Sequence, residues 1–162
     1  MNAIAWLRAH VAGFAHLTRS DRTAIHHFTL LWTVFEARLL GTNASPAQIR
    51  RLVDCLRDAN RIDPVALAPS LDYFRDRYWS ALGPTPAFPH LRLRDNERPD
   101  VERALSGQIE TPSAILTALL FIVQRLRNNL FHGPKWNGGM VDQRRNFQHA
   151  SRILMATMDM HH

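Results

Sequence analysis

The stretch from Ala114 to Val123 restricts the fold of this chain more than any other segment. It is apolar at every position except Thr117. A helix that is apolar on nearly all sides has to be covered by neighbours all round. The run has about half the length that a helix needs to cross a bilayer. We therefore expect residues 112 to 131 to form a helix in the middle of a helical bundle.

Helical spacing of apolar residues continues through most of the remaining chain. It predicts a first helix over about 2–17 and a second that begins at a cap, Ser20 or Asp21, and stops at Gly41. The third and fourth helices begin at Ser45-Pro46 and Asp63-Pro64 and run to about residues 60 and 82. The last helix covers about 141–158. Pro69 is a candidate break or kink, and a short helix is expected near Pro99 to Leu105. Together these segments predict an all-α, up-and-down helical bundle of five to six helices.

Length and cysteine content limit the organisation of the chain. The 162 residues correspond to about one domain. No boundary interrupts the pattern, so we expect residues 1–162 to form a single domain. Cys55 is the single cysteine, which excludes an intrachain disulfide and suggests a reducing compartment. We expect this thiol to be buried in the core. The N-terminus lacks a signal-peptide pattern, so the expected location is cytoplasmic, with no membrane association.

The charge of the chain is carried almost wholly by arginine. The formal net charge is +6, and the basic residues are 19 Arg and the single Lys135. Guanidinium groups suit bidentate binding of phosphate, so this balance favours a nucleic-acid partner. The alternative is that arginine simply replaces lysine on a solvated surface. Residues 83 to 100 form a proline-rich, basic connection that includes Arg92 and Arg94, and such long connections are often functional or mobile.

Strong polar groups gather at the end of the most apolar helix, in the run from Arg127 to Gly133. Asn128 and His132 are four residues apart and share a helical face, which Arg127 can also reach. Arg127 can clamp a phosphate and stabilise charge in a transition state. His132 can transfer a proton near neutral pH. RNA supplies its own 2′-hydroxyl nucleophile, so this chemistry requires no metal.

A single chain provides one such histidine, and a two-fold dimer would provide two. The alternative is an ordinary helix end, because a histidine is favourable near a helix C-terminus.

This run resembles the signature of the HEPN superfamily, in which an Arg is followed by four to six residues and then a His. The gap here is four residues, from Arg127 to His132, and a polar residue, Asn128, follows the Arg. The segment Trp32-Thr-Val-Phe-Glu36 resembles the family's early helix with an aromatic and a Glu on one face. The resemblance is strong over about ten residues, and the expected bundle extends it to most of the chain.

The resemblance implies a helical bundle that dimerises through the motif helix. Many HEPN proteins are metal-independent endoribonucleases of toxin–antitoxin, anti-phage or CRISPR-linked systems. Arg127 and His132 would be the catalytic pair, and Asn128 would hold the pair in place. In one branch the His is followed by one residue and a Tyr that is modified. Gly133 and Pro134 follow His132 here, so control through that Tyr is not expected.

Several other residues are candidates for supporting roles. Lys135 follows the motif closely, and Arg125, Arg92 and Arg94 are candidates for guiding an RNA backbone. Glu36 lies on the apolar stripe of its helix and needs a partner if it is buried. It either contacts Arg127 or Asn128, or faces water at the edge of the core.

No metal or cofactor site is predicted. His26 and His27 are adjacent and do not have the spacing of a helical ligand pair, and the glycines form no phosphate-binding loop.

The sequence thus favours a metal-independent endoribonuclease of HEPN type, in a toxin–antitoxin or anti-phage defence system. The expected partners are RNA, a second copy of the chain, and an antitoxin or other defence-system protein. The first alternative is a non-catalytic HEPN module that binds RNA, a nucleotide or a partner protein. A helical scaffold without a nucleic-acid role and, more weakly, a helix-turn-helix DNA binder remain as further alternatives.

Overall fold

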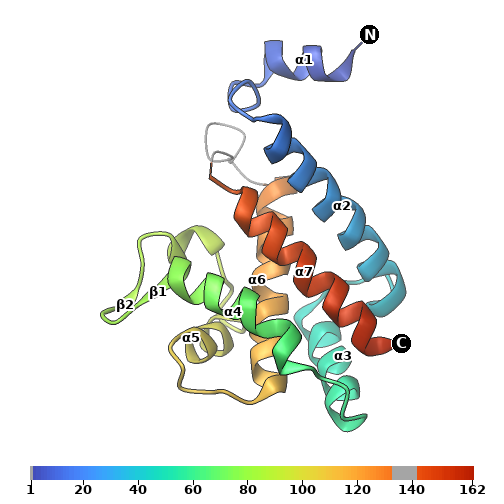
Figure 1. Cartoon of the computed structure of the whole chain (residues 1–162), viewed down its shortest axis with the longest axis vertical. Helices are drawn as coiled ribbons and strands as arrows, with labels where there is room; N and C mark the ends of the chain where they lie inside the picture. Colours follow the sequence, from blue (N-terminus) through green and yellow to red (C-terminus); the bar gives the residue numbers. More distant parts are fainter. Residues whose placement is uncertain (1, 133–141) are drawn as a thin grey trace.

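The computed structural model describes residues 2–132 and 142–162, and their regular structure is almost wholly helical (Figure 1). This confirms the predicted all-α bundle, although the described part contains seven α-helices where five to six were predicted. The elements are α1 (Ala3–His10), α2 (Arg19–Leu39), α3 (Pro46–Asp58), α4 (Pro64–Tyr78), β1 (Trp79–Ser80), β2 (Gly83–Pro84), the 3-10 helix η1 (Phe88–Leu91), α5 (Arg98–Leu105), α6 (Pro112–His132) and α7 (Arg144–His161).

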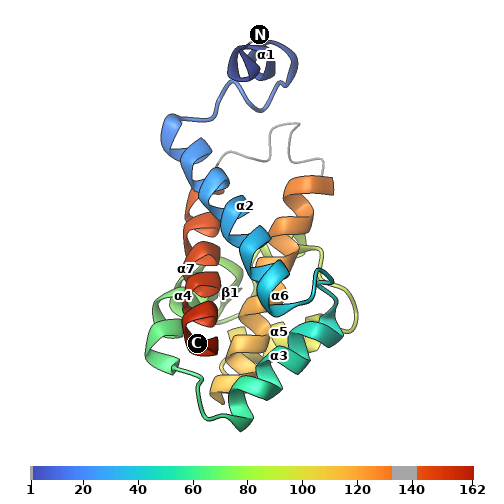
Figure 2. The ribbon, with the colours of Figure 1, turned by 90° about the vertical axis from the view of Figure 1, so that its right-hand side faces the viewer.

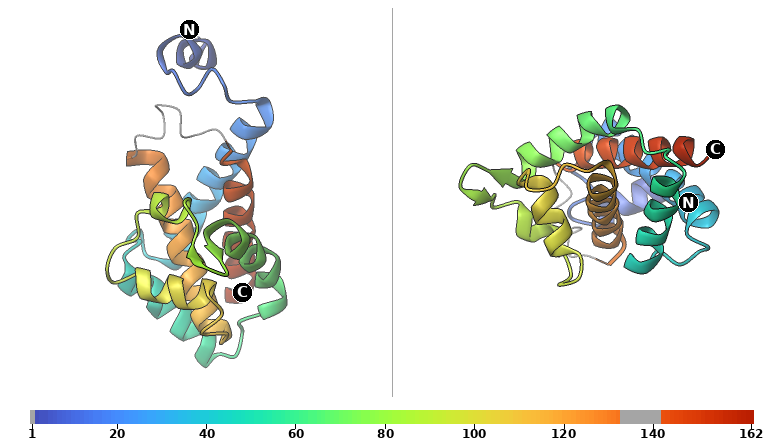
Figure 3. Two further views of the ribbon diagram at one scale, coloured as in Figure 1. Left: turned by 90° about the vertical axis from the view of Figure 1, so that its left-hand side faces the viewer. Right: turned by 90° about the horizontal axis from the view of Figure 1, so that it is seen from below.

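Helix α6 is the centre of the bundle, as its apolar sequence predicts. It packs against α3, α4, α5, α7 and η1, which surround it in the view from below (Figure 3). Leu116, Leu119 and Phe121 are completely buried along its length. Helices α2 and α7 lie side by side and run in the same direction, while α6 runs against them (Figures 1 and 2). The C-terminal end of α6 therefore lies at the same end of the bundle as the beginnings of α2 and α7.

The first predicted helix, over residues 2–17, is wrong in its extent. Helix α1 ends at His10, and Val11 takes an extended conformation with φ −119° and ψ 103°. Phe14 and Leu17 are nevertheless buried, so the apolar spacing continues across a turn that contains Gly13. Glycine disfavours helix, and core contacts of the two apolar residues hold the turn in its place. Helix α1 consequently stands apart from the rest of the bundle (Figures 1 and 3).

Local caps account for where the next helices begin. Helix α2 begins after Thr18, whose hydroxyl and backbone N–H exchange hydrogen bonds with Asp21 in a capping box. The predicted cap at Ser20 or Asp21 is thus two to three residues too late. Ser45 and Asp63 cap α3 and α4 as predicted, each followed by a proline at the first helical position.

Helix α4 passes through Pro69 and ends at Tyr78, four residues before the predicted end. The chain then becomes extended at Trp79, whose ring packs edge-on against Phe88 with centroids 5.7 Å apart. A two-residue antiparallel pairing follows, with Ser80 opposite Gly83. This aromatic contact with a later segment stabilises the extended conformation. The helical spacing of the sequence around residue 79 gives no sign of it.

The expectation of a buried thiol is also wrong, because Cys55 is exposed on α3. The buried positions of this helix are Ile49, Leu52, Val53 and Leu56. Cys55 directly precedes Leu56 but lies off the buried stripe, since adjacent positions on a helix are about 100° apart.

Within residues 2–132 and 142–162, the structure has no helix with the length and apolar character needed to span a membrane.

Candidate functional site

A shallow pocket of about 350 Å³ lies where the second half of α6 faces the end of α2. Four of the residues that the sequence analysis selected line it, namely Glu36, Arg94, Arg127 and Asn128. The connection from Thr42 to Pro46 and the side chain of Gln124 complete its wall. The fold therefore brings together candidates that lie as much as 92 positions apart in the sequence (36 to 128).

Arg127 is held in this pocket by aromatic rings and one amide. Its Nη1 donates a hydrogen bond of 3.0 Å to Asn128 Oδ1. Its guanidinium carbon lies 5.7 Å from the ring centroid of Trp32 and 5.3 Å from that of Phe131, within the range of cation–π attraction. Its Nε is buried and has no hydrogen-bond partner within residues 2–132 and 142–162. In the part of the chain that the structure describes, Arg127 forms no salt bridge.

Glu36 acts on this arginine through Trp32. The indole Nε1 of Trp32 donates a hydrogen bond of 3.1 Å to Glu36 Oε2, one helical turn along α2. This bond fixes the ring on which the Arg127 guanidinium lies. Glu36 is half-buried and lines the same pocket as Arg127 and Asn128. The structure therefore places Glu36 at the motif, with Trp32 as the connecting side chain.

Gln124 is a pocket residue that the sequence analysis did not select. Its side chain is buried, and its Nε2 donates to the backbone carbonyl of Ala44. Its Oε1 has no hydrogen-bond partner among the described residues. Gln124 lies three residues before Arg127 and is the first polar side chain after the apolar run, so helical spacing could have indicated that the two share a face.

Arg125 is buried in an ion pair, so it is not presented to solvent as a guide for an RNA backbone would be. Its side chain is 8% exposed and forms a salt bridge with the fully buried Glu97, with Nε 3.1 Å from Oε2. A second contact of 3.1 Å joins Nη2 to Oε1. Burial lowers the pKa of Arg125 while the charge of Glu97 raises it. The pair connects α6 to the segment before α5, so Arg125 supports the fold.

The basic connection before α5 is attached to α6 by Asn129. This buried side chain donates hydrogen bonds of 3.1 and 3.2 Å to the carbonyl groups of His90 and Leu91. Arg92 and Arg94 follow directly and are both exposed, and Arg94 lines the pocket. Asn129 thus has a structural role beside the pocket. Its neighbour Asn128 contacts the arginine.

The side chains of two predicted site residues lie outside the part of the chain that the structure describes. His132 is the last residue of α6, and its side chain lies outside the described part of the chain, as does Lys135. Their catalytic and supporting roles stay predictions. Phe131, directly before His132, is 54% exposed at this end of α6.

A second polar cluster lies between α4 and α7 and is buried. His149 Nδ1 is 3.2 Å from Ser70 Oγ, and the imidazole stacks on Tyr73 with ring centroids 4.1 Å apart. Burial, together with the charges of Arg152 and Arg145, lowers the pKa of His149 to about 4. Ser70 is only 1% exposed, so this Ser–His contact is closed to a substrate and belongs to the core.

Comparison with known proteins adds no assignment. Scans against protein-family models, curated proteins and solved structures each found no significant match. In residues 2–132 and 142–162, no three His, Cys, Asp or Glu side chains are grouped as a metal ion would require.

Proposed function

We propose that this chain is a metal-independent endoribonuclease of the HEPN type, acting in a toxin–antitoxin or anti-phage defence system. Arg127 and His132 are its catalytic pair in this proposal. The observation that carries it is the state of Arg127: a half-buried guanidinium at an open pocket, oriented by two aromatic rings and an amide, with no salt bridge to another described residue.

Six of the eighteen other arginines form salt bridges with carboxylates among the described residues, namely Arg50, Arg57, Arg77, Arg98, Arg103 and Arg125. The other twelve form none there, so Arg127 stands out by its place in the pocket between two aromatic rings. An arginine that is preorganised but unpaired can bind an anion without first breaking an internal ion pair. A phosphate oxygen would accept charge-assisted hydrogen bonds from the exposed part of the guanidinium, and bonds of this type are the stronger ones. This supports a phosphate ligand at Arg127.

The proposed reaction uses the 2′-hydroxyl of RNA as nucleophile. A base removes its proton, the 2′-oxygen forms a bond to the neighbouring phosphorus, and the bond from phosphorus to the 5′-oxygen breaks. An acid returns a proton to that 5′-oxygen, and a 2′,3′-cyclic phosphate remains. Arg127 stabilises the added negative charge on the phosphoryl oxygens, Asn128 orients Arg127, and His132 transfers a proton. Lys135 contributes further positive charge, and a two-fold dimer supplies a second His132.

One observation favours the alternative of a non-catalytic HEPN module. The carboxylate of Glu36 lines the same pocket as Arg127, and its negative charge opposes the approach of a phosphate. A pocket that offers both signs of charge suits a nucleotide base or a side chain of a partner protein. In that case wild-type protein would bind a ligand at Arg127 without cutting RNA.

Cleavage of end-labelled single-stranded RNA in the presence of EDTA tests the proposal. We expect wild-type protein to cut, and Arg127→Ala and His132→Ala each to reduce the rate at least about 100-fold, the loss that removal of one charge-stabilising group causes in enzymes. Arg51→Ala is the matched control, because Arg51 is exposed on α3. Far-ultraviolet circular dichroism checks the fold, and sedimentation measures the dimer. Absence of cutting by the wild type, or equal cutting by all variants, would refute the catalytic proposal.

A further inference from the structure

Helix α1 exposes an aromatic side chain that the fold does not use. None of the residues of α1 is buried, and Trp6 is 48% exposed. The contacts of this segment with the bundle come from Leu7 and Val11, which pack partly against the core. Trp6 lies on another face of the helix, because consecutive residues are about 100° apart. An indole presented in this way adds no core packing.

The Trp6 ring is held in a fixed orientation by His10. The two rings stack with centroids 4.4 Å apart and an angle of 10° between their planes. A hydrogen-bond contact of 2.8 Å between His10 Nδ1 and the Trp6 carbonyl oxygen sets the histidine in place. A flat and oriented aromatic pair at the surface is the usual platform for an unpaired base, which stacks on it regardless of sequence.

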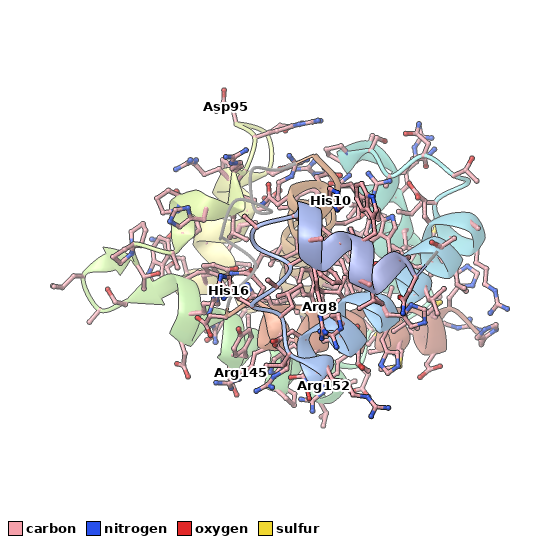
Figure 4. The ribbon with its side chains drawn as sticks, turned by 90° about the horizontal axis from the view of Figure 1, so that it is seen from above. Arg8, His10, His16, Asp95, Arg145 and Arg152 are labelled. Atoms are coloured by element: carbon pink, nitrogen blue, oxygen red, sulfur yellow. The ribbon has the colours of Figure 1, made fainter. Side chains whose placement is uncertain are left out.

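Several basic side chains lie on α1 and on the helices below it. Helix α1 contains Arg8 and no acidic residue. Figure 4, which looks down on this end of the molecule, shows Arg8, His10 and His16 toward the middle of the view, Arg145 and Arg152 of α7 at one edge, and Asp95 at the opposite edge. Arg19, at the start of α2, lines a groove together with Arg152. The nearby carboxylate of Asp21 is engaged with Thr18 in the capping box of α2. Such a surface attracts a polyanion.

We propose that α1, the start of α2 and the first half of α7 bind single-stranded RNA, with a base stacked on Trp6 and phosphates contacting Arg8, Arg19, Arg145 and Arg152. The proposal depends on the proposed function only for the choice of RNA as the nucleic acid. Helix α6 ends at this same end of the bundle (Figure 2), and Arg127 lies five residues before its last residue, or about 7.5 Å along the axis. A strand bound at α1 would therefore continue toward the pocket.

A membrane surface is the other polyanion that such a helix could meet. Interfacial helices need one continuous apolar face opposite a polar one. The two large apolar side chains that α1 exposes, Ile4 and Trp6, are two positions apart and so point about 200° apart. The eight residues of α1 thus provide no face that could enter a bilayer, and the observations favour RNA.

Binding of a labelled single-stranded RNA of about twelve nucleotides, measured by fluorescence anisotropy in the His132→Ala background, tests the inference. We expect Trp6→Ala to weaken binding about tenfold, as loss of one stacked base does, and Trp6→Phe to retain most of the affinity. Arg8→Ala should weaken binding and reduce the slope of log K against log salt by about one. Leu82→Ala, at the fully exposed tip of the β1–β2 turn, is the control with unchanged binding.

The outcomes separate this inference from the catalytic proposal. Unchanged RNA binding by Trp6→Ala and Arg8→Ala overturns the inference and leaves cleavage at Arg127 unaffected. Binding that depends on Trp6, from a wild-type protein that cuts nothing, supports the inference and refutes the nuclease. A Trp6-dependent blue shift with anionic phosphatidylserine vesicles, without any response to RNA, overturns it in favour of a membrane surface. Trp6→Ala is expected to fold, because no residue of α1 is buried.

Discussion

Arg125 and Arg127 lie two residues apart on α6, and their replacement by methionine should separate stability from activity. Removal of one partner from a buried ion pair costs about 3–5 kcal/mol. Glu97 is fully buried and Arg125 is 8% exposed. The Arg94 backbone N–H remains as a donor to Glu97 Oε2 at 3.0 Å, so we expect Arg125→Met to cost about 3 kcal/mol, the lower end of that range.

Arg127→Met should cost less, because the contacts of Arg127 are weaker. It loses one hydrogen bond and two ring contacts, and each cation–π contact contributes about 0.5–1 kcal/mol at a partly exposed site. Removal of its unpartnered buried Nε offsets part of that loss. The expected net cost is about 1 kcal/mol. Arg125→Met should retain RNA cleavage below its unfolding temperature, whereas Arg127→Met should lose it.

Urea unfolding followed by circular dichroism measures both costs. The double variant Arg125→Met with Glu97→Gln should recover part of the lost stability, because it no longer leaves an unpaired buried charge. High salt should change the cost of Arg125→Met little, since buried pairs are poorly screened. If Arg125→Met and Arg127→Met destabilise the protein equally, the burial of the Arg125–Glu97 pair cannot be what distinguishes the two arginines.

Three further predictions concern other polar groups. Because burial lowers the pKa of His149 to about 4 from 6.5, the unfolded chain takes up a proton first as the pH falls. The contribution of His149 to stability is therefore complete above about pH 6.5 and is lost between about pH 6.5 and 4, by up to roughly 3 kcal/mol. Unfolding measured across this range should show that slope, and His149→Gln should flatten it; equal slopes would contradict the prediction. Asn129→Ala leaves the His90 and Leu91 carbonyl groups without their donor and should cost about 1–3 kcal/mol. Hydrogen exchange should then accelerate across residues 88–94, and an unchanged exchange pattern would count against the proposed attachment. Glu36→Gln keeps an acceptor for the Trp32 indole but removes the negative charge beside Arg127. KM for RNA should therefore fall several-fold with little change in kcat. A large loss of kcat would instead indicate that the carboxylate itself takes part in the reaction.

The parts of the fold that the sequence predicted are those determined by local chemistry. Helix α6 was predicted over residues 112–131 and covers Pro112–His132, because an apolar run of that length admits few alternatives. The starts of α3 and α4 follow from Ser45-Pro46 and Asp63-Pro64. The end of α1 could not be found in this way. Apolar spacing continues through the turn, and contacts of Phe14 and Leu17 with distant residues decide the conformation there.

The same distinction applies to the candidate site. The motif selected Arg127 and Asn128, which form a hydrogen bond, and the aromatic-plus-Glu pattern of α2 pointed to Glu36, which lines the same pocket. The sequence could not show which of Arg125 and Arg127 faces the core. The two side chains point about 200° apart, and the residues that decide between them, Glu97 and Trp32, lie in separate elements. Asn129 was missed for the same reason, since its acceptors are backbone groups of η1.

The pocket at Arg127 is made from α2, the connection after it, the segment before α5 and the second half of α6. A ribosome synthesises these pieces in order, and Arg127 is among the last of them to be added. A nascent chain therefore has no assembled pocket until α6 has emerged and its long-range contacts have formed. Premature termination before residue 112 would yield a product without the site. If the proposed activity resides in this pocket, it requires the folded chain, and a partner that delays folding would restrain it as well as one that covers the pocket.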